Sequence, residues 1–85
     1  MPIISRFFGI VIYMYWKDHS PPHFHAKYGD DEVVIEIKNG NVIGQMSNRA
    51  LRLIQEWREL HQEELLKDWE LAENKNALFA INPLE

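Results

Sequence analysis

The sequence predicts an α+β fold, an antiparallel meander of about four strands with two helices packed on one face. Three observations support this class. The first half alternates apolar and polar side chains with a period of two, which is typical of strands. An Asn-Gly pair at positions 39 and 40 indicates a hairpin. The second half repeats apolar residues at helical spacing, and helices that follow a run of strands favour α+β.

Residues 9–16 predict the first strand, because they are rich in β-branched and aromatic side chains and too few for a typical helix. Both faces are largely apolar, which favours a central strand or one whose second face meets a partner. The first face holds Ile10, Ile12, Met14 and Trp16, and the second holds Val11, Tyr13 and Tyr15.

Residues 23–28 predict the second strand, after a loop that prolines stiffen at residues 17–22. Its apolar face holds Phe24, Ala26 and Tyr28, and its polar face holds His23, His25 and Lys27.

The third strand is expected at residues 32–38 and a short fourth strand at about residues 41–45. Matching apolar faces places Tyr28 opposite Val33, and therefore His25 opposite Glu36. A type I′ turn at Asn39-Gly40 would pair Ile37 with Val42.

Ser47 is the expected N-cap of the first helix. Its apolar stripe contains Ala50, Leu53, Ile54, Trp57 and Leu60. A second stripe either continues the first helix or begins anew near His61-Gln62, and it contains Leu65, Leu66, Trp69 and Ala72. Residues 74–76 end the helical pattern, and residues 77–83 are expected to form an edge strand or a docking tail.

Composition and charge disfavour several classes of protein. The length of 85 residues predicts a single domain over residues 1–85. The absence of cysteine excludes disulfides, thiolate metal sites and thiol catalysis, and fits a reducing compartment. The longest apolar run is too short for a membrane helix, and no signal-peptide layout is present, so a cytoplasmic location is expected. A net charge of −4 disfavours duplex DNA binding by the protein alone.

The loop and strand from His19 to His25, with the sequence HSPPHFH, carry the most functional information. His23 and His25 should project from one face of a strand, about 6–7 Å apart at Cα. Such a pair suits general acid–base catalysis without a metal, as in a ribonuclease, with Glu36 orienting His25. Arg6 or Arg49 would then bind the phosphate.

Each of these residues also has an alternative role. His23 and His25 could instead bind a transition metal such as zinc, with a carboxylate such as Glu36, or the third histidine His19, completing the site. The two strand histidines could instead only brace the proline loop, and the arginines could be solvated surface residues. Tyr13 and Tyr15 would be partner-binding residues if exposed and core residues if buried.

The chain resembles the bacterial domain of unknown function family 4160. The resemblance rests on the start Ile4–Ile10, the loop Asp18–Ala26, and the helix that runs from Arg49 through Trp57 to His61. It implies a small stand-alone bacterial or archaeal protein, encoded in gene pairs that look like toxin–antitoxin modules. The resemblance implies no specific activity.

The first functional hypothesis is therefore a component of a toxin–antitoxin-like pair that acts through a small protein partner. If it is the toxin, it would cleave RNA with His23, His25 and Glu36. The alternatives are a metal-binding protein or metal-dependent hydrolase, and an interaction module without chemistry. A second copy of the chain could also cover the apolar second face of the first strand.

Overall fold

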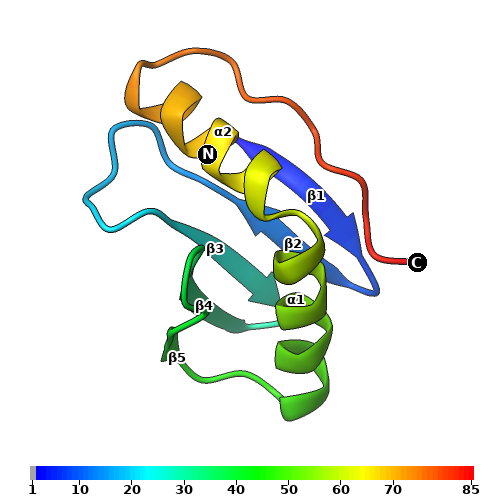
Figure 1. Ribbon diagram of the computed structural model, residues 1–85. Coiled ribbons are helices and arrows are strands. Elements are labelled where there is room, and N and C mark those ends of the chain that lie inside the picture. Colours follow the sequence, from blue (N-terminus) through cyan, green and yellow to red (C-terminus); the bar gives the residue numbers. More distant parts are fainter. Residues whose placement is uncertain (1) are drawn as a thin grey trace.

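The computed structural model describes residues 2–85, which form five strands followed by two helices (Figure 1). The strands are β1 (Ile3–Phe7), β2 (Ile10–Tyr13), β3 (His23–Tyr28), β4 (Asp31–Glu36) and β5 (Val42–Gly44). The helices are α1 (Asn48–Leu60) and α2 (Gln62–Glu73). The predicted α+β class is confirmed, with one strand more than expected. Within the described residues, neither helix has the length and apolar character needed to cross a membrane.

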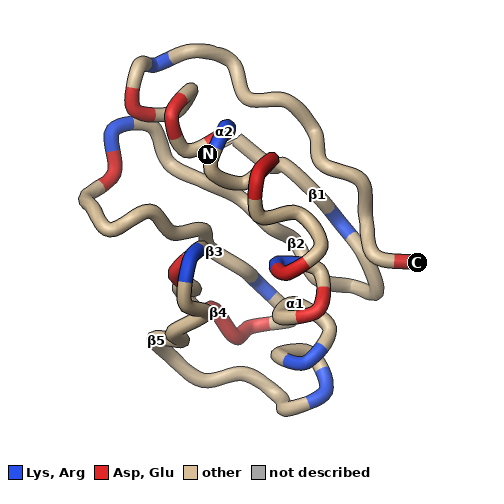
Figure 2. The backbone as a smooth tube through the Cα atoms, in the orientation of Figure 1, with Lys and Arg blue, Asp and Glu red and all other residues tan. Residues whose placement is uncertain are grey.

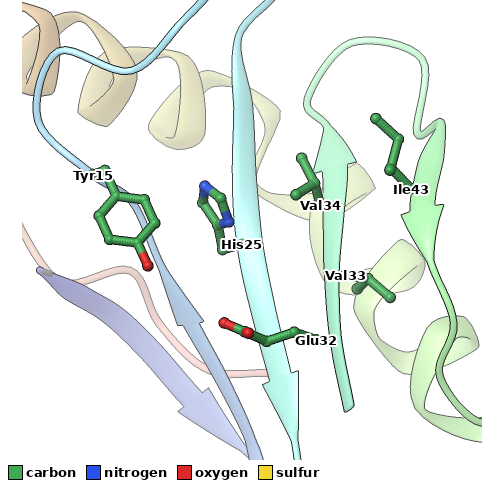
Figure 3. A pocket seen from close by; sticks show the side chains of 6 residues that line it. All are labelled: Tyr15, His25, Glu32, Val33, Val34 and Ile43. Atoms are coloured by element: carbon green, nitrogen blue, oxygen red, sulfur yellow. The ribbon is translucent and has the colours of Figure 1, made fainter.

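The sheet is an antiparallel meander in the order β1-β2-β3-β4-β5. Both helices cover one face, where the core side chains gather, and the other face of the sheet is open (Figures 1 and 3). The core contains Ile12, Phe24, Ala26, Val33 and Ile35 from the sheet, and Ile54, Trp57, Leu65 and Trp69 from the helices. The polar face of β3 is therefore the open face.

The strand β1 was not predicted. It pairs with β2 through a two-residue turn at Phe8 and Gly9, whose φ angles are 49° and 81°. Such a turn needs two positive φ angles, and phenylalanine rarely adopts one. Because Phe8 is not a typical turn residue, the sequence offered little sign of this hairpin.

The predicted register between β3 and β4 is wrong by two residues. Tyr28 pairs with Asp31 rather than with Val33, because the turn contains only Gly29 and Asp30. A shift of two preserves which side chains face the core, so matching faces could not detect it. As a result His25 lies opposite Val34, not Glu36.

The predicted turn between β4 and β5 is also wrong. Residues 37–41 separate the two strands, Ile35 pairs with Val42, and Gly40 but not Asn39 has a positive φ.

Ile37 explains this longer connection. Its side chain is buried, and its N–H donates to the Pro22 carbonyl at 3.0 Å instead of to β5. Its carbonyl accepts hydrogen bonds from the side chains of Arg58, at 2.8 Å, and Gln62. The Pro22 loop and the two helices thus satisfy both backbone groups of Ile37, which therefore does not pair with β5.

The helices follow the prediction closely. The Ser47 hydroxyl accepts a hydrogen bond from the Ala50 N–H at 3.1 Å and caps α1. A break at His61 separates α1 from α2. Trp57 and Trp69 are buried as predicted, but Leu60 is 66% exposed because it lies in the last turn before the break.

Residues 77–83 form a docking tail rather than a strand. The tail runs beside β1 (Figure 1), where the Ile81 N–H donates to the Ile4 carbonyl at 2.8 Å. The Trp57 indole donates to the Asn82 carbonyl, also at 2.8 Å. The tail is therefore hydrogen-bonded both to the edge strand β1 and to Trp57, a fully buried residue of the core.

A buried carboxyl group, Asp68, holds the start of this tail. One of its oxygens accepts the Phe79 N–H at 3.1 Å, and the other has no hydrogen-bond partner among the described residues. Burial raises the pKa of Asp68 to about 6; the Phe79 hydrogen bond opposes this rise and the nearby Glu64 adds to it. The folded protein therefore binds this proton more tightly than the unfolded chain.

We expect Asp68→Asn to raise the free energy of unfolding by about 1–2 kcal/mol at pH 7.5 and to change it little at pH 4. Between pH 4 and pH 7.5 the folded state binds more protons than the unfolded state. Ionisation of Asp68 therefore lowers the free energy of unfolding as pH rises. Urea unfolding at both pH values measures the difference, with the exposed Glu70→Gln as the control. A difference that does not depend on pH would contradict this account.

Candidate functional site

Three side chains that can bind a metal meet on the open face of the sheet. The Asp18 Oδ2 atom lies 2.8 Å from His23 Nε2 and 3.2 Å from His25 Nε2. The potential ligand atoms of the three residues all lie within 4.8 Å of one another, and all three side chains are partly buried. We refer to these three residues as the Asp-His-His cluster.

Contacts with α2 hold the loop that carries Asp18. The Lys17 N–H donates to the Ala72 carbonyl at 3.1 Å, and the Trp16 indole donates to the Asn76 carbonyl at 3.2 Å. Lys17 has a φ of 55°, which is unfavourable for a residue other than glycine and needs such contacts to persist. The position of Asp18 therefore depends on the end of α2.

The hydrogen bonds of His23 define which of its nitrogens carries a proton. Its Nδ1 lies 2.8 Å from the Pro21 carbonyl, which can only accept, so Nδ1 must donate. Its Nε2 faces the Asp18 carboxylate, which also accepts. The hydrogen bond to Pro21 therefore directs the second ring nitrogen, Nε2, toward the Asp18 carboxylate.

Aromatic side chains fix the ring of His25. It stacks on Tyr13, with ring centroids 5.2 Å apart and an interplanar angle of 14°, and Tyr15 meets it edge-on at 4.7 Å. The Tyr13 hydroxyl donates to Glu32 Oε1. Burial, the hydrogen bond to Glu32 and the Glu32 charge raise the pKa of Tyr13 well above its usual value, so it remains a donor at neutral pH.

The Asp18 carboxyl group is held in its ionised form. Burial acts to raise its pKa, but hydrogen bonds from His25, the His19 N–H and His23 outweigh this effect and lower it. The pKa of Asp18 therefore lies below its usual value, so its contribution to stability is present near neutral pH and is lost as pH falls. An ionised carboxylate between two imidazoles is suited to bind a cation.

Two hollows flank His25 on the open face, and His25, Val34 and Ile43 line both. The first hollow is about 260 Å³ and is completed by Tyr15, Glu32 and Val33 (Figure 3). The second is about 360 Å³ and is completed by Asp18, His19, Ser20, Pro21, His23 and Glu36. The Asp-His-His cluster is thus open to a groove large enough for part of a small ligand.

The structure does not bring Glu36 to His25. Glu36 lies opposite His23 in the sheet and lines the second hollow. Its carboxylate accepts hydrogen bonds from the side-chain amides of Asn39 and Asn41, both at 3.3 Å. The expectation that Glu36 orients His25 depended on the incorrect register; Asp18 has that contact instead.

Asp18, not His19 or Glu36, is the third potential ligand beside His23 and His25; the sequence pattern did not indicate it. His19 is exposed and lies outside the Asp-His-His cluster, although its N–H donates to Asp18 Oδ1 at 2.8 Å. The sequence feature that could have indicated Asp18 is a carboxylate in the proline-containing loop directly before the strand with His23 and His25.

The remaining candidate residues lie in different places. Arg6 is exposed on β1, and Arg49 is exposed in the first turn of α1, on the helix-covered side of the sheet. Figure 2 shows the basic residues at the start of α1 at the opposite end of the molecule from the loop between β2 and β3. Tyr13 is buried beneath His25 and has no surface for a partner, whereas Tyr15 is 42% exposed.

Comparison with known proteins gives one family match. A family model described as a domain of unknown function, DUF4160, matches residues 9–70, which include the whole loop, the Asp-His-His cluster and α1. No curated protein and no solved structure matches the chain.

Proposed function

Because the chain belongs to the family of DUF4160 domains, whose description names no activity, we propose a function from the geometry of the site. Asp18, His23 and His25 bind a divalent transition metal, zinc being the first choice, and the metal activates water for hydrolysis. The observation that carries this proposal is the convergence of two imidazole nitrogens and a carboxylate oxygen within 4.8 Å at a groove.

The type and number of ligands support a catalytic rather than a structural metal. Structural zinc sites are usually closed by four protein ligands, whereas catalytic sites use three and leave a position for water. Two imidazoles and one carboxylate form such a three-ligand set, and the groove supplies access for water and substrate. Bound to zinc, water loses a proton near neutral pH and becomes a nucleophile.

The surroundings of the histidines support the same function. A metal-binding histidine usually donates its second ring N–H to a carbonyl or carboxylate, which presents the other nitrogen to the metal. His23 has this arrangement, because its Nδ1 donates to the Pro21 carbonyl and its Nε2 faces the cluster. Stacking on Tyr13 holds the ring of His25.

Zinc titration of the metal-free protein tests the proposal. We expect one equivalent to bind, and at 100 times the dissociation constant the melting temperature should rise by about 10–20 °C. Isothermal titration calorimetry gives the stoichiometry and thermal unfolding gives the shift. Absence of binding by zinc, manganese(II), iron(II) and nickel(II) alike would refute the proposal.

A second candidate is metal-free ribonuclease activity as the toxin of a toxin–antitoxin-like pair. Its support is the proximity of the His23 and His25 rings, whose centroids are 5.2 Å apart. Two imidazoles at this separation can act as acid and base. This candidate predicts RNA cleavage that persists in EDTA, whereas a metal-dependent hydrolase is inactive in EDTA.

A further inference from the structure

We infer that the hollow between Tyr15 and Glu32 binds the cationic side chain of a lysine or arginine, so that the ligand of this groove is a basic peptide. As a statement about the substrate of the metal centre, this inference rests on the proposed function. The binding of the cation itself depends only on the hollow and can be measured without a metal.

The charge of the groove favours a cation. Asp18, Glu32 and Glu36 are the acidic residues that line the two hollows, and neither lining includes a lysine or arginine. Lys27 lies opposite Glu32 in the sheet, but within the described residues it forms no ion pair with Glu32. A divalent ion at the cluster would offset two of these three negative charges, so the two linings would keep a net negative charge of one. The linings therefore favour a basic side chain over an anionic phosphodiester.

Glu32 is arranged as an acceptor before any ligand arrives. Tyr13 donates its hydroxyl to Oε1 of Glu32, and Oε2 has no hydrogen-bond partner among the described residues. Figure 3 shows the Glu32 carboxylate directed toward the space beside His25 and Tyr15. A carboxylate that is already oriented loses less entropy when it binds an ammonium or guanidinium group.

The other walls of the hollow suit the rest of a basic side chain. Tyr15 offers an aromatic ring that is 42% exposed, and a cation near such a ring gains a cation–π interaction. Val34 and Ile43 form the apolar wall, and Ile43 is 64% exposed. The methylene stem of a lysine and an apolar neighbour in the peptide would cover this wall.

The test is an NMR titration of the metal-free ¹⁵N-labelled protein with two blocked peptides, acetyl-Leu-Lys-Leu-amide and acetyl-Leu-Glu-Leu-amide. We expect the lysine peptide to shift the amide signals of His25, Glu32 and Val34, and to bind at least about tenfold more tightly than the glutamate peptide. Glu32→Gln should weaken lysine-peptide binding about tenfold, because glutamine keeps an acceptor for Tyr13 but loses the charge.

The control variant is Glu56→Gln, which makes the same charge change at an exposed position of α1. Equal effects of the two variants, equal binding of the two peptides, or no binding of either peptide would overturn the inference. Shifts of the same amides that grow with protein concentration alone would assign the hollow to a second copy and also overturn it. Since no metal is present, failure of zinc binding would not alter these outcomes.

Discussion

Replacing His23 or His25 with alanine is expected to lower the affinity for zinc at least about 100-fold, since changes even to residues that only support metal ligands cost about 10–100-fold. Each variant leaves one imidazole and the Asp18 carboxylate, which are too few ligands for a stable three-ligand site. The zinc-dependent rise in melting temperature should disappear in both variants. Calorimetric titration of the purified variants measures the loss directly.

His19→Ala is the matched control for this experiment. It removes a histidine from the same loop, but His19 is exposed and its ring lies outside the Asp-His-His cluster. Its N–H contact to Asp18 is made by the backbone and survives the substitution. Zinc affinity in this variant should therefore remain within a few-fold of the original, and a loss as large as that of the other two variants would refute the assigned ligand set.

The pH dependence of zinc binding provides an independent check. Imidazoles bind a metal only in their neutral form, and Nε2 of both histidines faces the cluster. Protons compete with zinc for these nitrogens, so the apparent zinc affinity should fall as pH is lowered from 8 to 6. Titrations in buffers of different ionisation enthalpy would show proton release on binding, and a pH-independent affinity would contradict the model.

Trp57→Ala should lower the free energy of unfolding by about 3–5 kcal/mol, which is the usual cost of removing a fully buried large aromatic side chain. The Trp57 ring packs against Phe7 of β1 and Phe24 of β3, with ring centroids 5.3 and 5.7 Å apart, and its indole N–H binds the Asn82 carbonyl of the tail. One side chain thus connects α1, two strands and the tail.

Small domains have a total stability of only about 5–15 kcal/mol, so this variant should melt at least about 15 °C lower or fail to fold. Thermal unfolding followed by circular dichroism measures the shift. Leu60→Ala in the same helix is the control, because its 66% exposed side chain should contribute less than about 0.5 kcal/mol. Comparable losses in the two variants would show that Trp57 is not the central core residue.

Much of the fold follows from local patterns in the sequence. Alternation located β3 at residues 23–28, and Ser47 with the following apolar stripe located α1. The errors arose where distant contacts decide the outcome. Ile37 leaves the sheet because α1 and α2 bind its carbonyl, and Phe8 adopts a positive φ because β1 pairs with β2. Neither contact can be predicted from the residues that neighbour Ile37 or Phe8 in the sequence.

The site was predictable only in part, because local patterns locate the histidines but not the distant contacts that complete the site. His23 and His25 lie on one face of a strand, which period-two alternation indicates. Their carboxylate partner could not be identified by matching faces, because registers that differ by two residues preserve the same faces. The position of Asp18 depends on contacts far along the chain, because Lys17 binds Ala72 near the end of α2 and Trp16 binds Asn76 just beyond it.

This attachment of the Asp18 loop sets the order in which the site can form during synthesis. On the ribosome strand β3, which carries both histidines, emerges well before Ala72 and Asn76. A nascent chain therefore has its imidazoles but not the contacts that fix the carboxylate. Completion of the site therefore reports completion of the fold. If the cluster binds a metal as proposed, only chains that have been completed through Asn76 would hold all three ligands in place to bind it.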